Sequence, residues 1–269
     1  MRTLSQLQQL NGQWALITGG AGHVGHAAAQ TLLELGAHVI LLDRSEQQLQ
    51  QVHSSVYDGS DKVYTLSCEL SQPSEISTAM AKVSELTQGK LNILINNAAF
   101  VGTDKLSGWC VPFEQQSLET FNDCLNVNLS APFQLCQHAY ELMKNTPGAA
   151  ARIVNISSIY GVVGPQMDMY EGTDMGNPAA YATSKAGLMQ LTRWLAANVA
   201  PRVRVNNIVL GGIERGQPES FLNKYNAKVP LARMATEEDV KGAIAYLSSE
   251  LSNYMTGQSL FLDGGWTAI

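Results

Sequence analysis

The stretch TGGAGHVG, Thr18 to Gly25, lies between a short apolar run, residues 14–17 (WALI), and an Ala- and Leu-rich segment that ends at Leu35-Gly36. A strand, a glycine-rich turn and a helix in this order allow a dinucleotide pyrophosphate to bind at the helix N-terminus. The glycine spacing is unusual, because His23 stands two positions before Gly25, where a Gly-x-Gly pair needs glycine. The spacing that holds is Gly-x-x-Gly-x-x-Gly. The stretch predicts a nucleotide-binding α/β fold. Its glycine spacing leaves open which kind of enzyme it belongs to.

Apolar runs alternate with helical patterns along the rest of the chain. The expected strands are 14–18, 38–42, 62–67, 92–95, 151–156, 203–209 and 259–262. The expected helices are 23–35, 45–56, 73–87, 117–144, 179–199, 218–225 and 236–249. Short, nearly all-apolar strands alternating with helices indicate a parallel sheet that is covered on both faces. We therefore expect a Rossmann-type, doubly wound parallel sheet of about seven strands with helices on both faces, in a single domain over residues 1–269.

Ligands of such folds bind beyond the carboxyl ends of the strands, near the point where the strand order reverses. Two long stretches interrupt the regular alternation there, residues 100–116 and the Gly-, Pro- and Met-rich residues 161–180. Loops of this length in a compact domain are usually functional or disordered. Both stretches are expected on the substrate side.

Composition narrows the class of partner. The 269 residues are 45% hydrophobic and 15% charged, which favours a packed domain over disorder. A net charge of −6 and the lack of a Lys/Arg run argue against nucleic acid. The four cysteines contain no Cys-x-x-Cys pair and suit a reducing compartment. No stretch reads as a signal peptide or a membrane span. We expect a cytoplasmic protein with no membrane partner and no metal site.

The second expected strand ends in Asp43, about 20 residues after the glycine loop. A carboxylate there accepts hydrogen bonds from the adenosine ribose hydroxyls of NAD and repels the 2′-phosphate of NADP. Arg44 follows at once and offers a positive charge to that phosphate instead. Because the Asp43 carboxylate would repel the 2′-phosphate directly, NAD is the expected cofactor, with NADP as the alternative.

Tyr181 and Lys185 lie four residues apart at the start of an expected helix, which places both on one face. A nearby ammonium group stabilises a phenolate, so the pair can exchange a proton with an alcohol or carbonyl during hydride transfer. Tyr140 and Lys144 have the same spacing, but they lie inside the long 117–144 pattern and precede the serine-bearing strand. For these two we expect an ordinary helix-surface role.

These residues resemble the classical short-chain dehydrogenase/reductase family over nearly the whole chain. The resemblance rests on the glycine loop 18–25, NNAA at 96–99, Asn128 in NVNL, Ser158 in NISS, Tyr181 with Lys185, and TGQSLFLDGG at 256–265. It implies that Tyr181 is the general acid/base, that Lys185 lowers its pKa, and that Ser158 orients the substrate oxygen. It further implies that Asn128 holds a water in a proton relay, with Ser157 left as a structural residue.

The resemblance also implies which residues bind the cofactor. Glu69 stands where the family usually has an aspartate near the adenine, and the backbone of Ile213 is expected against the nicotinamide carboxamide. The full implied set is Gly19, Gly22, His23, Val24, Gly25, Asp43, Arg44, Glu69, Leu70, Asn97, Ala98, Tyr181, Lys185, Gly211 and Ile213.

The chain departs from the family pattern at several places. Ala99 replaces the usual glycine of Asn-Asn-Ala-Gly, Leu210-Gly211 replaces Pro-Gly, and Arg215 stands where a threonine often contacts the cofactor. The glycine spacing itself is typical of the family's extended branch. That branch has an additional C-terminal substrate region for which this chain has no room, so the loop is interpreted as a variant within the classical branch.

The expected activity is hydride transfer between the cofactor and a secondary alcohol or ketone, with a sugar or polyol in surface-polysaccharide metabolism as the first candidate. The expected substrate walls are the two insertions and residues 213–226, with Asp168, Tyr170, Glu171 and Asp174 as hydrogen-bonding groups. A non-catalytic NAD(P)-binding regulator or scaffold is the alternative. Apolar positions on helices 117–144 and 179–199 predict a homo-oligomer, a tetramer or dimer. They are Phe133, Leu135, Leu188, Leu191, Trp194 and Leu195.

Overall fold

The computed structural model describes residues 1–100, 106–146 and 151–269. Within these ranges one parallel sheet has the strand order β3-β2-β1-β4-β5-β6-β7. The strands are β1 (Trp14–Thr18), β2 (His38–Asp43), β3 (Val63–Ser67), β4 (Ile93–Asn96), β5 (Ala151–Ser158), β6 (Val203–Leu210) and β7 (Ser259–Leu262). The order reverses between β1 and β4, as in doubly wound sheets. The predicted fold class is confirmed.

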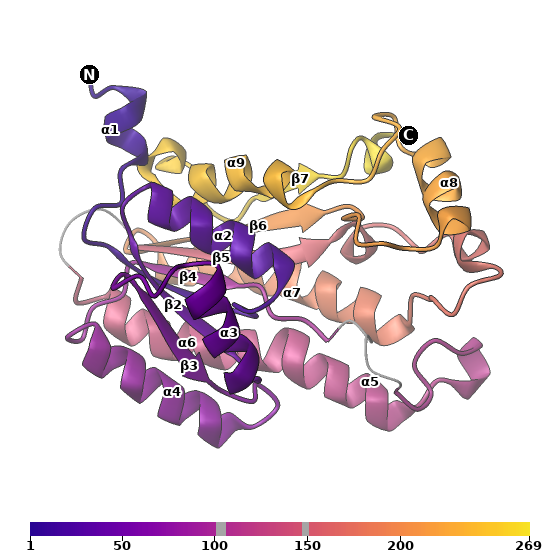
Figure 1. Cartoon of the computed structure of the whole chain (residues 1–269), viewed down its shortest axis with the longest axis horizontal. Helices are drawn as coiled ribbons and strands as arrows, with labels where there is room; N and C mark the ends of the chain where they lie inside the picture. The colour runs from indigo at the N-terminus through magenta and orange to yellow at the C-terminus, as the bar shows by residue number, and fades with distance from the viewer. Residues whose placement is uncertain (101–105, 147–150) are drawn as a thin grey trace.

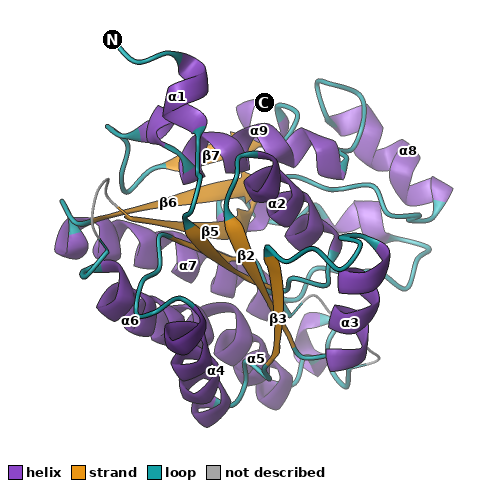
Figure 2. Ribbon diagram, turned by 60° about the vertical axis from the view of Figure 1, so that its left-hand side comes forward, coloured by secondary structure: helices purple, strands orange, loops and turns teal. Residues whose placement is uncertain are grey.

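Helices cover both faces of the sheet (Figures 1 and 2). The helices are α1 (Leu4–Gln8), α2 (His23–Glu34), α3 (Glu46–Ser55), α4 (Pro73–Leu86), α5 (Leu118–Leu125), α6 (Ala131–Met143), α7 (Ala179–Val199), α8 (Glu219–Lys228) and α9 (Glu237–Ser248). None of those in the described part of the chain is long and apolar enough to cross a membrane.

Strand residues alternate between two apolar layers. Ala15 and Ile17 of β1 pack with α2, α3 and α9, whereas Leu16 packs with α4, α6 and α7. Because successive side chains of a strand point to opposite faces, a strand that is apolar throughout needs cover on both sides. The two layers leave the carboxyl ends of the strands free to form a site.

The structure differs from the predicted elements in two places. The expected helix 117–144 is interrupted by a π-helical turn, η2 (Asn126–Ser130), between α5 and α6. Such turns hold an extra residue in the helix and often lie at functional sites. The short α1 was not expected. It starts at a capping box, in which Thr3 and Gln6 exchange side-chain-to-backbone hydrogen bonds.

Candidate active site

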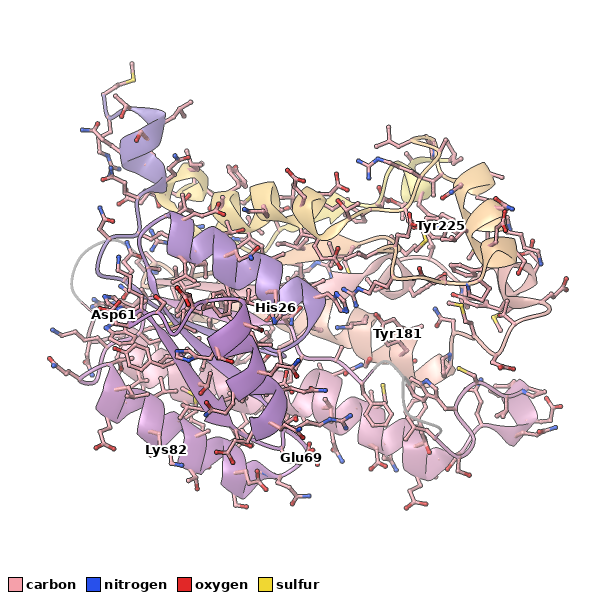
Figure 3. The ribbon with its side chains drawn as sticks, in the orientation of Figure 1. His26, Asp61, Glu69, Lys82, Tyr181 and Tyr225 are labelled. Carbon is pink, nitrogen blue, oxygen red and sulfur yellow. The ribbon has the colours of Figure 1, made fainter. Side chains whose placement is uncertain are left out.

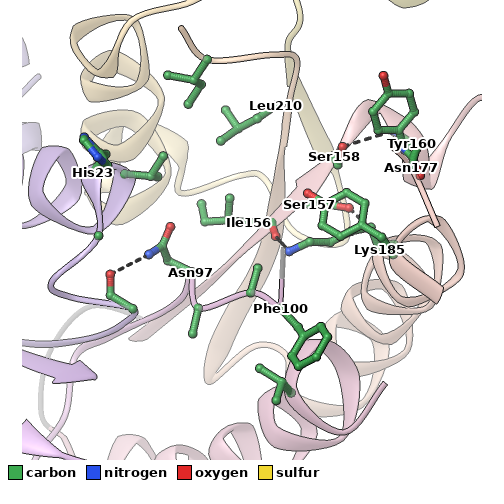
Figure 4. Close-up of a pocket in the computed structure, with 18 of the residues that line it drawn as sticks. His23, Asn97, Phe100, Ile156, Ser157, Ser158, Tyr160, Asn177, Lys185 and Leu210 are labelled. Carbon is green, nitrogen blue, oxygen red and sulfur yellow. Dashed lines mark hydrogen bonds between the residues drawn. The ribbon is translucent and has the colours of Figure 1, made fainter. Parts of the chain in front are cut away.

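A cavity of about 740 Å³ runs along the carboxyl ends of the strands, from the glycine loop to α7 and α8 (Figure 4). Most of the residues predicted for catalysis and cofactor binding line it together. They are Gly19, Gly22, His23, Val24, Asp43, Arg44, Glu69, Leu70, Asn97, Ala98, Ser158, Tyr181, Lys185, Gly211 and Ile213. Gly25 and Asn128 do not line this cavity.

The glycine loop is shaped by close backbone approaches. Gly19 has φ +65°, and a Cβ there would lie 2.9 Å from the Cα of Ala98. A Cβ on Gly25 would lie 2.2 Å from the carbonyl oxygen of Gly19. Gly25 therefore acts indirectly, by letting α2 pack against the loop. Gly22 caps α2 without a side-chain hydrogen bond, so the first amides of α2 suit an anion such as a pyrophosphate.

Asp43, at the end of β2, faces the same end of the cavity. Its Oδ2 accepts a hydrogen bond from the Ala21 amide at 3.1 Å, and its Oδ1 accepts one from the Arg44 amide at 2.8 Å. The carboxylate thus fixes the glycine loop while it lines the cavity. Each oxygen keeps a further lone pair, which suits a pair of ribose hydroxyls.

The neighbouring strand ends form the adjoining wall of the cavity. Asn97 donates from Nδ2 to the carbonyl oxygens of Thr18 and Gly19, at 2.9 and 3.1 Å. The Thr18 hydroxyl accepts from the amides of Asn97 and Ala98, both at 3.0 Å. These bonds join the ends of β1 and β4 at the switch in strand order. Glu69, also in the wall, accepts from the Ser71 amide at 3.0 Å (Figure 3).

Ser158 ends β5, and Tyr181 and Lys185 lie one turn apart on α7. The Ser158 hydroxyl lies close enough to the Tyr181 side chain to lower the pKa of Tyr181. Lys185 Nζ lies 5.8 Å from the centroid of the Tyr181 ring and donates to the carbonyl oxygen of Ile156 at 2.8 Å. Ser157 donates its hydroxyl to the Lys185 carbonyl oxygen at 3.0 Å, a structural contact. Three of the four expected catalytic side chains, Ser158, Tyr181 and Lys185, therefore line the same part of the cavity.

The electrostatics of this cluster differ from the expected lowering of the Tyr181 pKa. Burial raises the pKa of Tyr181 to about 12, and the hydrogen bond from Ser158 and the charge of Arg215 only partly oppose it. Burial also lowers the pKa of Lys185 to about 8. Desolvation of the charged form is the largest cause of both pKa shifts. Tyr181 is accordingly a phenol here, poised to donate a proton.

Asn128 lies buried in the π-helical turn η2. Its Oδ1 accepts from the Phe100 amide at 2.6 Å, and its Nδ2 donates to the Ser184 hydroxyl at 3.0 Å. Asn128 thus connects Phe100, in the segment that follows β4, with Ser184 of α7. Ser184 lies three residues after Tyr181. The position supports Tyr181 and Lys185, and the water relay that the family resemblance implies for Asn128 stays a prediction.

Sequence reasoning missed a charged contact at the mouth of the cavity. Glu237, at the start of α9, contacts His23 Nδ1 at 3.3 Å and Arg215 Nε at 3.5 Å. His23, the first residue of α2, is exposed. The contact thus joins His23 and Arg215, two departures from the family pattern. No local motif predicts it, because α9 is remote in sequence from both residues.

The expected acidic substrate wall is wrong. Asp168, Glu171 and Asp174 are exposed and do not line the cavity. Asp168 forms an ion pair with Lys228 at 2.8 Å, because the segment packs against α8. Of the predicted polar groups only Tyr170 faces the cavity.

The observed wall is mainly aromatic. From the first insertion Phe100, Leu106 and Trp109 line it, while residues 101–105 of that insertion lie outside the described residues. The later wall residues are Tyr160, Tyr170, Met175, Asn177, Gln217, Phe221 and Tyr225. Tyr160 and Asn177 were not predicted. Tyr140 and Lys144 lie outside this wall, and Lys144 is paired with Glu141 on the surface of α6.

Comparisons with known proteins agree with this geometry. The family profile described as enoyl-(acyl carrier protein) reductase matches residues 19–267. The chain belongs to the short-chain dehydrogenase/reductase family. It is 34% identical over 265 residues to the 3-oxoacyl-(acyl-carrier-protein) reductase FabG of Rickettsia bellii, covering 95% of this chain and 97% of that protein. It is 32% identical over 267 residues to a tropinone reductase homolog of Arabidopsis thaliana, covering 96% and 91%.

Solved structures of the family superpose over the whole chain. A short chain dehydrogenase from Leptospira borgpetersenii with bound NAD+ is 34% identical, covers 99% of this chain and 96% of its own, and gives a TM-score of 0.84. A short-chain type dehydrogenase/reductase from Mycobacterium marinum is 27% identical, with full coverage of both chains and a TM-score of 0.86. This short-chain dehydrogenase/reductase is therefore an NAD(P)-dependent oxidoreductase acting on CH–OH or carbonyl groups.

Proposed function

We propose that this enzyme transfers hydride between NAD(H) and a secondary alcohol or ketone that carries at least one further hydroxyl group, such as a polyol or a sugar-derived ketone. The observation that carries the proposal is the meeting of Ser158, Tyr181 and Lys185 in a cavity whose other end holds Asp43. The intact catalytic set favours turnover over the alternative of a non-catalytic scaffold. A link to surface polysaccharides is supported only by the amino-acid sequence of residues 161–180.

In this proposal the cofactor takes up or supplies the hydride, and side chains of the protein donate or accept the proton. Ser158 donates a hydrogen bond to the reacting oxygen and holds it beside the Tyr181 hydroxyl. In reduction Tyr181 gives its proton to that oxygen, and in oxidation it takes the proton back. The Lys185 ammonium beside the ring stabilises the phenolate that Tyr181 becomes when it has given up its proton.

NAD is the proposed cofactor because the Asp43 carboxylate lines the cavity at the end of β2. A second negative charge, from the 2′-phosphate of NADP, would have to be placed beside it. Among relatives, the Leptospira borgpetersenii structure holds NAD+. Arg44 lines the same wall, and NADP remains the alternative.

The proposed assembly is a homo-oligomer, a tetramer or a dimer. Leu135, Leu188 and Leu195 are buried against the sheet and are not available, which corrects part of the sequence expectation. Phe133 of α6 and Trp194 of α7 keep 42% and 56% of their surface exposed. Exposed aromatic side chains on the two long helices support a contact with another copy of the chain. The proposed location is the cytoplasm, which the four unpaired cysteines support.

The direct test of the activity is reduction of carbonyl compounds with NADH and with NADPH. The panel contains hydroxyketones, simple ketones and a 3-oxoacyl thioester. The proposal expects NADH-dependent turnover of hydroxyketones that exceeds turnover of the thioester. Exclusive reduction of the thioester would replace the proposed substrate class, and absence of turnover with both cofactors would contradict the activity.

A further inference from the structure

Three polar side chains of the substrate wall form a connected group within an otherwise aromatic surface. The hydroxyl oxygens of Tyr160 and Tyr170 lie 2.7 Å apart, and the Asn177 side chain lies near enough to Tyr170 to lower the pKa of its hydroxyl. All three residues line the cavity. We refer to Tyr160, Tyr170 and Asn177 as the polar node.

The node adjoins the reacting groups. The Tyr160 amide donates to the Ser158 hydroxyl oxygen at 3.2 Å, and Figure 4 draws Tyr160 and Asn177 next to Ser158. On its other side the Tyr170 ring packs against Phe221, with centroids 5.6 Å apart. A molecule whose reacting oxygen is held by Ser158 and Tyr181 therefore has the polar node as a neighbour.

The hydrogen bonds within the node leave one acceptor unsatisfied. The Oδ1 of Asn177 has no hydrogen-bond partner among the described residues, although only 8% of Asn177 is exposed. A buried polar atom without a partner costs about 1–3 kcal/mol. Because Asn177 lines the cavity, a small turn of its amide would let a ligand group become that partner.

The same bonds leave one donor unsatisfied. Burial raises the pKa of both tyrosines, so each keeps its proton. Two hydroxyl protons are present and the bond between the two tyrosines uses one of them. The node therefore offers one O–H donor together with one carbonyl acceptor.

We propose that the polar node binds a second hydroxyl group of the substrate, one that is not oxidised or reduced in the reaction. A hydroxyl group donates to Asn177 Oδ1 and accepts from the spare tyrosine O–H, so it satisfies both positions. An ether or carbonyl oxygen satisfies only the donor, and a carboxylate faces Oδ1 with a like partial charge. The other polar wall residue nearby, Gln217, is already bonded to Ile213 and Arg215.

The inference rests on the proposed function, and its test separates the two. The probes are acetoin with its parent methyl ethyl ketone, and diacetone alcohol with its parent methyl isobutyl ketone, which place the hydroxyl at two distances from the carbonyl. In the wild type, kcat/KM for at least one hydroxyketone should exceed that for its parent by about tenfold or more, mainly through KM.

Two variants remove the two halves of the node. Asn177→Leu removes the acceptor, and the double change Tyr160→Phe with Tyr170→Phe removes the donors. In either variant the preference for the hydroxyketone should fall by about tenfold. Tyr57→Phe is the matched control, because Tyr57 is a buried tyrosine outside the cavity whose hydroxyl has no partner among the described residues. It should keep the wild-type preference.

Binding is also measured without turnover, as the rise in Tm that each probe causes in Tyr181→Phe loaded with NADH. A larger rise with the hydroxyketone that is lost with Asn177→Leu supports the node even if the wild type reduces none of the probes, an outcome that would contradict the proposed function alone. Equal shifts for hydroxyketone and parent, or a preference that survives both node variants, overturn the inference.

Discussion

At the scale of single residues, the charged side chains that line the cavity decide which ligand charges it can accept. Asp43 lines the cavity and fixes the glycine loop at once, since its two oxygens accept from the amides of Ala21 and Arg44. The change Asp43→Asn keeps the size of the side chain and removes its charge, but the new amide nitrogen faces one of the two backbone donors.

We predict that Asp43→Asn lowers the preference for NADH over NADPH by at least about tenfold, because the repulsion of the 2′-phosphate is removed. NADH binding should weaken as well, since an amide group replaces one acceptor. Fluorescence titration of both cofactors against wild type and variant measures the ratio. An unchanged ratio would show that Asp43 is not the selector.

Lys185 gives a second prediction at this scale. Its pKa is lowered from 10.5 to about 8 in the folded protein, so between these values the unfolded chain holds a proton that the folded chain has lost. Its contribution to the free energy of unfolding therefore rises with pH across this window, and below it the buried charge is destabilising. Lys185→Met should gain stability relative to wild type at about pH 7 and lose part of that gain at about pH 10. Urea unfolding of both proteins measures the gap, and a gap independent of pH would contradict the burial argument.

At the scale of elements, the sequence predicted the strands well because their apolar runs are short and bounded by turn residues. It predicted one helix over 117–144, since the apolar pattern continues through the π-helical turn Asn126–Ser130. The turn depends on Asn128 bonding to Phe100 and Ser184, partners remote in sequence. Periodicity carries no information about such contacts.

The prediction for this element is that Asn128→Ala costs about 2–3 kcal/mol of the free energy of unfolding, because the Phe100 amide and the Ser184 hydroxyl lose a buried partner. Asn126→Ala is the control, since Asn126 lies in the same turn and is exposed. It should change stability by less than about 0.5 kcal/mol. Equal effects of the two changes in urea unfolding would remove the structural role of the Asn128 amide.

The candidate site also contains residues that the sequence predicted and residues that it did not. Ser158, Tyr181 and Lys185 were predictable because their spacing and strand context repeat a known family pattern. Tyr160 and Asn177 were not, since their role arises from a hydrogen-bonded group that forms only when the 161–180 segment packs against α8. Asp168 and Glu171 misled for the converse reason, because an acidic side chain in a loop indicates nothing about which way it points.

At the scale of the whole molecule, the aromatic residues Phe133 and Trp194 keep 42% and 56% of their surface exposed within one chain. We predict that Trp194→Glu lowers the mass in solution to that of a smaller assembly, since a buried carboxylate opposes an apolar contact. Light scattering coupled to size exclusion measures the mass of both proteins. A wild-type protein that runs as a monomer would contradict the proposed oligomer.

The central claim is that Tyr181 carries the proton in a nicotinamide-dependent reaction, and the most direct measurement is turnover by Tyr181→Phe. We predict that kcat for the best carbonyl substrate falls by at least about a hundredfold, while the Kd for NADH stays at its wild-type value. Turnover within a few-fold of the wild type would contradict the claim and assign the proton transfer to another group.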